Sequence, residues 1–399
     1  MSKEIFTGNF TQQAALPEAA LEAAMRVMQS GRLHRYNTAP GEMSEVAALE
    51  QEFASYMGAR YALAVTSGGY ALATALRALG VGPGDKVLTN AFTLAPVPGA
   101  IASVGAMPVF VEVTEDLVID LDDLAAKAGA ADVLMLSHMR GHIVDMDALM
   151  ALCAARGIRV IEDCAHTMGA KWNGVMSGRH GLIAAYSTQS YKHLNSGEGG
   201  LLITDDEALA AKMILLSGSY MLYDRHGAGP GEDAFEAVKY DTPNISGRMD
   251  NLRAALLRPQ LAALEESCAG WNARYRVVEE GLRDVQGLRL IARPEAEDYV
   301  MSSFQFLLLD WAAERVQEVV RRCAARGVEL KWFGAPEPSG FTSRYDSWRY
   351  AGAAPMPKSD RVLAGLLDLR LPLSFGLEDC ALIARIIRDE VGAVFQVGG

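Results

Sequence analysis

The sequence predicts an α/β fold with a mostly parallel, seven-stranded sheet, and two observations support this prediction. Seven short apolar runs, rich in aliphatic and β-branched residues, are typical of buried strands; they cover residues 61–66, 86–89, 108–113, 133–138, 158–164, 182–187 and 200–204. Helical segments separate most of these runs, and strands that alternate with helices usually form a parallel sheet covered on both faces. Ligands of such sheets bind at the carboxyl ends of the strands.

The helices that precede and connect these strands follow from apolar spacing and from breaker residues. A first amphipathic helix is expected to begin near Pro17 and to end at Gly31. Further helices are expected over about residues 43–56, 70–79, 121–128 and 146–157. Residues 90–111 carry no charge, but prolines and glycines interrupt them. We therefore expect a loop, a helix and a strand there rather than a membrane-spanning helix.

The pattern changes after Asp205, where the regular alternation ends. A long helical stretch is expected from about residue 250 to residue 284, and the last helices are expected from Asp360 onward. Between them lies a smaller unit with strands over residues 288–293, 302–310 and 328–333 and a helix over residues 314–327. A boundary near Gln260 then divides the chain into a large domain, residues 1–260, and a small C-terminal α/β domain, residues 261–399.

Composition and charge narrow the class of protein. The 399 residues are enough for two domains, and the 22% of charged residues is typical of a globular chain. The net charge of -12 offers no basic surface to phosphates, so we expect neither nucleic acid nor a membrane as a partner. The five cysteines include no CxxC pair and the N-terminus shows no export signal, which predicts reduced thiols, a cytoplasmic location and no metal site.

The first candidate for chemistry is the sequence TSGG, which follows the first predicted strand and precedes a helix. Ser67, Gly68 and Gly69 lie at this turn. Two glycines let the backbone approach a ligand, and the helix N-terminus offers unpaired N–H groups to an anion such as phosphate. The alternative interpretation is an ordinary tight turn between strand and helix.

The second candidate is IEDCAH, in which Asp163 ends an otherwise apolar strand and His166 follows three residues later. An aspartate at this position either caps the next helix or holds a proton on a heterocyclic nitrogen. His166 shares its neighbourhood, although a single histidine is more often structural than catalytic.

The third candidate is STQSYKHLNSGEGG, which carries Ser187 and Lys192 among hydroxyls, amides and glycines. A loop lysine is usually solvated, but an enclosed lysine has a lowered pKa and can form a Schiff base. An anion cradle, a strand-end aspartate and then an imine-forming lysine are what a pyridoxal phosphate enzyme requires. The order of the three candidates therefore predicts pyridoxal 5'-phosphate as the cofactor.

With these motifs in place, the sequence resembles the DegT/StrS-like sugar aminotransferases, a family of fold-type-I pyridoxal phosphate enzymes. The resemblance covers nearly the whole chain. It includes the segments SGRLHRYN, LEQEFASYMGARYALAVTSGGYALATALRALG, SHMRGHIVDMDAL, IEDCAHTMGA, STQSYKHLNSGEGGLLIT, GRMDNLRAALLRPQL and LRLPLSF. Their order and spacing, more than any one of them, identify the family.

The resemblance implies a role for each matching position. Lys192 would bind the cofactor through a Schiff base, Asp163 would pair with the pyridine nitrogen, and His166 would lie near the phenolic oxygen. The phosphate would be held by Ser187 together with the turn Ser67, Gly68 and Gly69, where Gly69 replaces the usual threonine of the family.

Three further positions depart from the family pattern. Leu94 stands where the family has an aromatic residue that stacks on the cofactor ring, and Phe92 is the aromatic nearby. Ser246 stands in the segment that reaches the phosphate of the partner subunit, where the family has asparagine, and Asn244 lies two residues earlier. Arg140 replaces a family aromatic after His138 and is a candidate anion contact.

The resemblance implies an aminotransferase that moves an amino group from an amino acid, glutamate or glutamine, to a keto sugar or related cyclic ketone in natural-product or cell-envelope synthesis. It also implies a homodimer with shared active sites. Other pyridoxal phosphate reactions, such as dehydration, decarboxylation or carbon–carbon cleavage, would use the same Lys192 and Asp163 and stay open, as does a non-sugar ketone as acceptor. A non-catalytic binding protein with the same fold is the remaining alternative.

Overall fold

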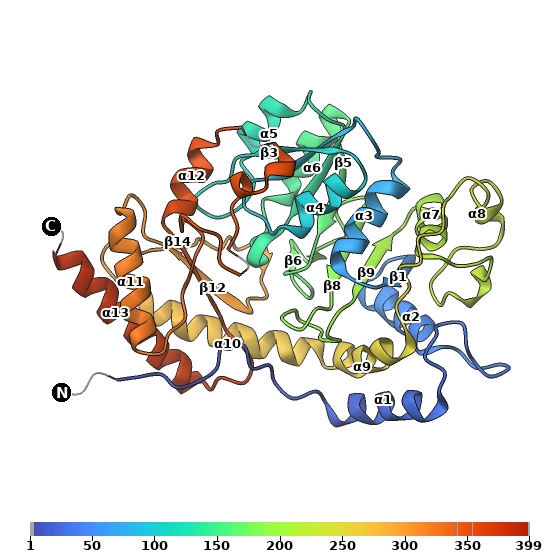
Figure 1. Ribbon diagram of the computed structural model, residues 1–399, viewed down its shortest axis with the longest axis horizontal. Coiled ribbons are helices and arrows are strands. Elements are labelled where there is room, and N and C mark those ends of the chain that lie inside the picture. The colour runs from blue at the N-terminus through green and yellow to red at the C-terminus, as the bar shows by residue number, and fades with distance from the viewer. Residues whose placement is uncertain (1–3, 341, 353, 398–399) are drawn as a thin grey trace.

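A seven-stranded sheet forms the centre of the computed structural model, which describes residues 4–340, 342–352 and 354–397. Its strand order is β1-β9-β8-β5-β4-β2-β3. The strands are β1 (Tyr61–Val65), β2 (Lys86–Asn90), β3 (Met107–Val111), β4 (Val133–Ser137), β5 (Arg159–Asp163), β8 (Ile183–Ser187) and β9 (Gly200–Thr204). All seven predicted strands are present, and the expected α/β class is confirmed (Figure 1).

The sheet is parallel except at β9, which pairs antiparallel with both β1 and β8. Ser187 at the end of β8 lies opposite Gly200 at the start of β9. Antiparallel neighbours can be joined by a short loop, whereas parallel neighbours need a long crossover. The segment between β8 and β9 therefore stays at the carboxyl end of β8, and this segment carries Lys192.

Helices cover both faces of this sheet and make two hydrophobic cores. On one face lie α3 (Gly68–Ala78), α4 (Pro96–Ser103) and α7 (Glu207–Ser217), with residues such as Leu72, Ile101 and Ile214 against the strands. On the other face lie α2 (Glu45–Met57), α5 (Leu121–Lys127), α6 (Met146–Arg156) and α9 (Asn251–Ala262). Successive strand residues point to opposite faces, so Leu63 joins the first core and Ala64 the second.

A second, four-stranded antiparallel sheet lies beside the large one (Figure 1). Its order is β10-β12-β14-β13, with β10 (Arg289–Leu290), β12 (Ser303–Leu307), β13 (Lys331–Trp332) and β14 (Leu366–Arg370). The prediction that the tail from Asp360 forms only helices was wrong, because β14 is a strand that pairs with both β12 and β13. Its alternating sequence, LLDLR, fits a strand that is buried between two neighbours.

The long helical stretch expected over residues 250–284 is two helices rather than one. It divides at Ala263 into α9 and α10 (Leu264–Leu282), and α10 packs against α13 (Leu377–Val397). The remaining helices are α1 (Glu18–Ser30), α8 (Asp233–Glu236), α11 (Ala313–Ala325) and α12 (Pro357–Ala364), and a small sheet joins β11 (Glu297–Asp298), β6 (Lys171–Trp172) and β7 (Val175–Met176). None of the helices in the described ranges has the length and apolarity that crossing a lipid bilayer requires.

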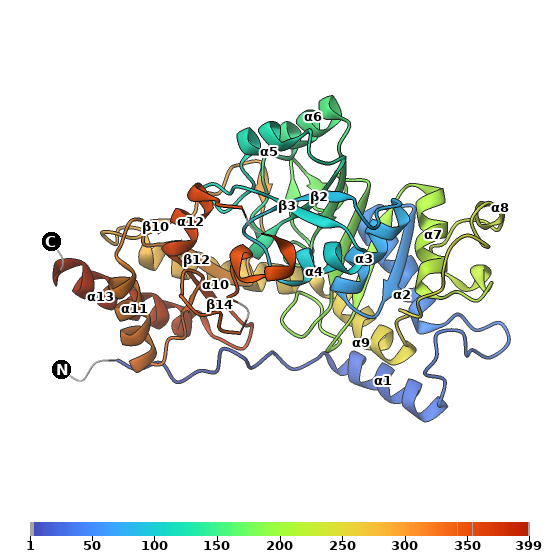
Figure 2. The same cartoon turned by 45° about the horizontal axis from the view of Figure 1, so that its top comes forward.

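The N-terminal segment runs along one side of the molecule, from the end that holds α11 and α13 to α1 near the other end (Figure 2). The rings of Phe6 and Phe10 pack edge-on against Phe375 in the core of the C-terminal unit, whereas α1 lies against α9. The segment between them therefore spans both units of the chain. The division into domains at residues 260 and 261 stays a prediction.

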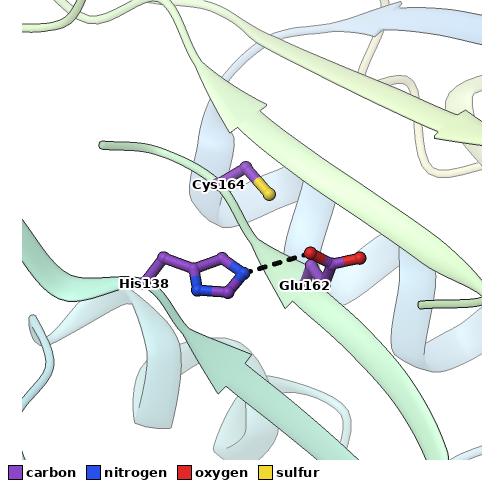
Figure 3. A group of neighbouring side chains, drawn as sticks. All are labelled: His138, Glu162 and Cys164. Atoms are coloured by element: carbon purple, nitrogen blue, oxygen red, sulfur yellow. Dashed lines mark hydrogen bonds and ion pairs between the residues drawn. The ribbon is translucent and has the colours of Figure 1, made fainter. Parts of the chain in front are cut away.

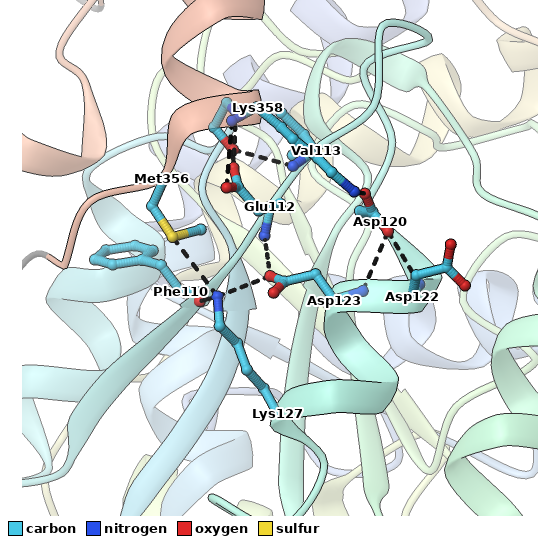
Figure 4. A network of polar contacts seen from close by, with 10 residues as sticks. Phe110, Glu112, Val113, Asp120, Asp122, Asp123, Lys127, Met356 and Lys358 are labelled. Atoms are coloured by element: carbon cyan, nitrogen blue, oxygen red, sulfur yellow. Dashed lines mark hydrogen bonds and ion pairs between the residues drawn. The ribbon is translucent and has the colours of Figure 1, made fainter.

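Polar contacts fasten α12 to the large sheet, as Figure 4 shows. The carboxylate of Glu112 accepts hydrogen bonds from the backbone N–H and the hydroxyl of Ser359, at 2.7 and 2.6 Å. The Lys358 ammonium lies 2.6 Å from a carboxylate oxygen of Asp120, which caps α5. Because α12 leads directly into β14, these contacts help to place the small sheet relative to the large one.

Candidate active site

A cavity lies where β5 and β8 end and α3 begins. Of the residues predicted from the sequence, it is lined by Gly68, Gly69, Leu94, Asp163, His166, Ser187 and Lys192. The prediction that these residues share one site is therefore consistent with their positions, although Ser67 and Ser246 do not line the cavity.

Lys192 is partly buried, and its amine lies 2.7 Å from Nε2 of His166. Burial and the positive charge of Arg140 together lower the pKa of Lys192 to about 7, against the opposing effect of Asp163. Burial and the charge of Lys192 hold the pKa of His166 well below its ordinary value. His166 is therefore neutral and can accept a hydrogen bond from the Lys192 amine, which is substantially deprotonated near neutral pH.

Asp163 is the last residue of β5, and only 8% of its surface is exposed. One carboxylate oxygen accepts a hydrogen bond from the Ser137 hydroxyl at 3.0 Å, and the other accepts the backbone N–H of Ala165 at 3.2 Å. Burial raises the pKa of Asp163, while the charge of Lys192 opposes this effect. The carboxylate is thus fixed in place beside the cavity.

Sequence reasoning missed the residues that hold Asp163 in position. Thr93 donates a hydrogen bond from its hydroxyl to that of Ser137 at 2.8 Å, and the side chain of Asn90 accepts the backbone N–H of Ser137 at 2.9 Å. All three lie at or just beyond the carboxyl ends of β2 and β4. Polar residues at the ends of apolar strands were the signal that could have found them.

The predicted anion cradle is built from the start of α3 and the end of β8. A Cβ atom added to Gly68 would lie 2.8 Å from the Cβ of Ser187, which is closer than side chains tolerate, whereas one added to Gly69 would meet Pro96 at 3.7 Å. The first N–H groups of a helix have no partner within it, so the start of α3 and the Ser187 hydroxyl together fit a phosphate. The hydroxyl of Ser67 instead caps α3 by accepting the N–H of Tyr70 at 3.1 Å.

Two residues were candidates to cover the cofactor ring. Leu94 lines the cavity, whereas Phe92 is 1% exposed and packs edge-on against Phe333 with ring centroids 5.2 Å apart. Of these two residues, Leu94 is the one that the cavity exposes to a ligand, and its contact with a cofactor ring stays a prediction.

Ser246 lies on an exposed segment away from the cavity lining. Its φ of 55° is in the left-handed region, and its backbone N–H donates to the side chain of Asn244 at 3.1 Å. Arg248 stabilises this segment by donating to the carbonyl of Gly218 at 2.9 Å. The role of Ser246 at a partner's phosphate stays a prediction.

A second group of buried side chains, drawn in Figure 3, includes the two chain neighbours of Asp163. His138, Glu162 and Cys164 each bring one possible metal ligand atom to within 4.8 Å of the others. Both oxygens of Glu162 already accept backbone N–H groups, from Gly178 at 2.9 Å and from His180 at 2.9 Å, and His138 lies 3.1 Å from one of them. We assign these contacts to holding the end of β5 in place, because they satisfy the Glu162 carboxylate within the protein.

Comparison with known proteins identifies the family. The profile of the DegT/DnrJ/EryC1/StrS aminotransferase family matches residues 16–388, so the chain belongs to that family. Among the curated relatives, it is 34% identical over 247 residues to a pleiotropic regulatory protein of Geobacillus stearothermophilus, a match that covers 59% of this chain and 62% of that protein. It is 32% identical over 362 residues to the dTDP-3-amino-3,4,6-trideoxy-alpha-D-glucose transaminase of Streptomyces venezuelae, covering 87% of this chain and 85% of the relative.

A solved structure supports the same conclusion about the fold. The crystal structure of a 3-amino-5-hydroxybenzoic acid synthase aligns with a TM-score of 0.80 and 27% identity, covering 98% of this chain and 100% of that one. The expected fold type and the expected class of enzyme, a pyridoxal phosphate-dependent aminotransferase, are confirmed at the level of the family.

Proposed function

We infer that the protein transfers an amino group from an amino acid, glutamate or glutamine, to a keto sugar or a related cyclic ketone, with pyridoxal 5'-phosphate bound in the cavity between β5, β8 and α3. The observation that carries this proposal is the convergence of Lys192, His166 and Asp163 on one cavity that also holds the anion cradle. The transaminase relative from Streptomyces venezuelae supports a sugar as the acceptor.

The residues around the cavity fit this cofactor. Bound pyridoxal phosphate would supply a ring that absorbs the electrons released when a proton leaves the carbon bearing the amine. The start of α3 and the Ser187 hydroxyl would hold its phosphate, and the buried Asp163 would keep a proton on its pyridine nitrogen. Leu94 would cover one face of the ring.

Lys192 would both hold the cofactor and move protons. Its amine, with a pKa of about 7, is available as a nucleophile and as a base at neutral pH. Once the amino donor has displaced it, Nζ would be free to take the proton from the donor's α-carbon and to return a proton in the following step. The neutral His166 imidazole at 2.7 Å would orient the amine between these steps.

A second candidate acceptor is a cyclic ketone that is not a sugar. The solved structure with 27% identity is named for the synthesis of an aminohydroxybenzoic acid, which carries a carboxylate on a ring. This likeness favours keeping carbocyclic ketones among the acceptors to be tested.

We also propose a homodimer in the cytoplasm. Three apolar side chains on α1, Leu21, Met25 and Met28, are 50–54% exposed at helical spacing and would gain from a covering subunit. The exposed segment around Ser246 would lie near the partner's cofactor. The five cysteines are buried thiols, which fits a reducing compartment.

The test is to load the protein with pyridoxal phosphate, convert it with glutamate, and mix it with nucleotide keto sugars, free cyclic ketones and keto acids. We expect at least one ketone to restore the original visible spectrum. Lys192→Ala should abolish turnover and the spectrum of the covalently attached cofactor. A Lys192→Ala variant that transaminates at the native rate would refute the assignment.

A further inference from the structure

Three cationic side chains gather beside the cavity from parts of the chain that are far apart in sequence. We call Arg140, Lys331 and Arg370 the cation cluster. Arg140 follows β4, Lys331 lies on β13 and Arg370 ends β14. Lys331 lies opposite Asp368 in the pairing of β13 with β14, and residues 368 and 370 point to the same face of the strand.

Arg140 is the centre of this cluster. It is 8% exposed, has a left-handed φ of 57°, and lies between Met139, which lines the cavity, and Gly141, whose added Cβ would lie 3.2 Å from the carbonyl of His166. Its Nη2 is 3.0 Å from Oδ2 of Asp368, but neither Nε nor Nη2 has a hydrogen bond with acceptable geometry to any described residue. A buried guanidinium with unmet donors is costly unless a ligand completes it.

Lys331 also has a buried donor without a hydrogen-bond partner. Its Nζ is buried and finds no hydrogen-bond acceptor within the described part of the chain. The pKa of Lys331 is lowered to about 8 by burial and by the charges of Arg140 and Arg370, while Asp368 opposes the shift. The remaining charged group that influences it is Glu329, which is exposed.

One buried carboxylate faces these three cations. Asp368 accepts a hydrogen bond from the side chain of Gln305 at 2.6 Å as well as facing Arg140. Arg370 lies over the ring of Tyr191, which directly precedes Lys192, with its guanidinium carbon 3.5 Å from the ring centroid. The cluster is therefore net positive and next to the amine that is proposed to react.

We propose that Arg140 and Lys331 bind a carboxylate carried by the reactant that lies against Lys192, and that the keto acceptor is therefore a cyclic ketone bearing a carboxylate. The assignment of the carboxylate to the keto acceptor rests on the proposed function, whereas the anion site itself does not. The unmet donors of Arg140 and Lys331 would then pair with the two oxygens of the incoming group. The amino donor also carries a carboxylate, so the experiment separates the two sources.

The anion site is tested first, on the cofactor-loaded protein and without any reaction. Calorimetric titration compares benzoate with its neutral isostere benzamide. We expect the wild type to prefer benzoate by about tenfold or more, which corresponds to one charge-assisted hydrogen bond. Lys331→Met and Arg140→Gln should lose this preference.

A control variant and a second variant of the cluster distinguish a specific loss of anion binding from a general loss of structure. Lys86→Met removes an exposed lysine at the opposite end of the large sheet and should keep the wild-type preference. Lys331→Met leaves the pair between Arg140 and Asp368 intact, so it remains usable if Arg140→Gln does not fold. A wild type that binds benzoate and benzamide equally overturns the inference, and so does a Lys331→Met variant that keeps the preference.

The two half-reactions then identify the source of the carboxylate. The amine-loaded enzyme is mixed with 3-oxocyclohexane-1-carboxylate or with its carboxamide, and separately the aldehyde-loaded enzyme is mixed with glutamate. We expect Lys331→Met to slow the half-reaction with the carboxylate ketone about tenfold, while the rate of the half-reaction with glutamate stays near that of the wild type. A selective loss of the glutamate step would overturn the assignment to the acceptor. If the protein prefers benzoate but transfers no amino group, the proposed function is refuted and the anion site is still supported.

Discussion

Lys192 and Lys331 are both enclosed, and both have lowered pKa values, about 7 and about 8, yet their surroundings differ. Lys192 has a neutral imidazole at 2.7 Å and shares its cavity with the Asp163 carboxylate and an anion cradle. Lys331 has Asp368 opposite it and two guanidinium groups nearby, with no acceptor for its amine among the described residues. A lowered lysine pKa alone therefore does not identify a nucleophile; its neighbours assign Lys192 to chemistry and Lys331 to recognition.

The largest effect is expected at Asp163, the carboxylate that lines the same cavity as Lys192. Asp163→Asn keeps the shape of the side chain but removes the charge that would hold a proton on the cofactor ring. We expect turnover with every substrate to fall by about a hundredfold or more. Lys331→Met, measured alongside, should raise KM for a carboxylate ketone with a much smaller effect on kcat. Equal losses in kcat for the two variants would remove the distinction between the two regions.

The sequence was most informative where function follows from position on a strand. Asp163, Ser187 and the Gly68 turn each lie at the end of an apolar run, and parallel strands bring such ends to one edge of the sheet. The position of Lys192 at the same edge could also be predicted, because β8 and β9 are antiparallel neighbours and the segment that joins them stays at the carboxyl end of β8. These local patterns were sufficient for the fold class and most of the cavity.

The sequence could not reveal the cation cluster, because no local pattern joins its members. Asp368 and Arg370 lie on β14, a strand that was taken for part of the last helices, and Lys331 reaches them only through the pairing of β13 with β14. The hydroxyl of Ser67 caps α3 and does not line the cavity, and a role for Ser67 at a cofactor's phosphate stays a prediction. Tertiary pairing brings the cation cluster together, and one sequence does not specify that pairing.

A matched pair of glycine variants tests the proposed anion cradle at the start of α3. In Gly68→Ala the new methyl group would lie 2.8 Å from the Cβ of Ser187, whereas in Gly69→Ala it would lie 3.7 Å from Pro96. We expect Gly68→Ala to weaken binding of pyridoxal phosphate by about tenfold, a loss comparable to one charge-assisted hydrogen bond, and Gly69→Ala to change it little. Equilibrium dialysis against the cofactor measures both, and similar affinities for the two variants would contradict the proposed cradle.

The smallest effect concerns pH and reports the titration of Lys192. In the cofactor-free protein the native pKa of Lys192 is about 7, below the ordinary 10.5 of an unfolded chain. Between these values the unfolded state binds a proton that the native state does not, so stability rises with pH across this window and the cost of burying the charged amine is fully present below it. We expect denaturant unfolding of wild type to gain stability relative to Lys192→Met as pH rises from 7 to 9. A difference that is constant with pH would show that the native pKa is not lowered.

The lysine that carries the cofactor can be identified directly. The wild-type protein is loaded with pyridoxal 5'-phosphate, the imine is reduced with borohydride, and the modified peptide is located by mass spectrometry. We expect a single stoichiometric adduct on Lys192, with Lys331 unmodified. Attachment at Lys331, or no covalent adduct at Lys192, would contradict this expectation.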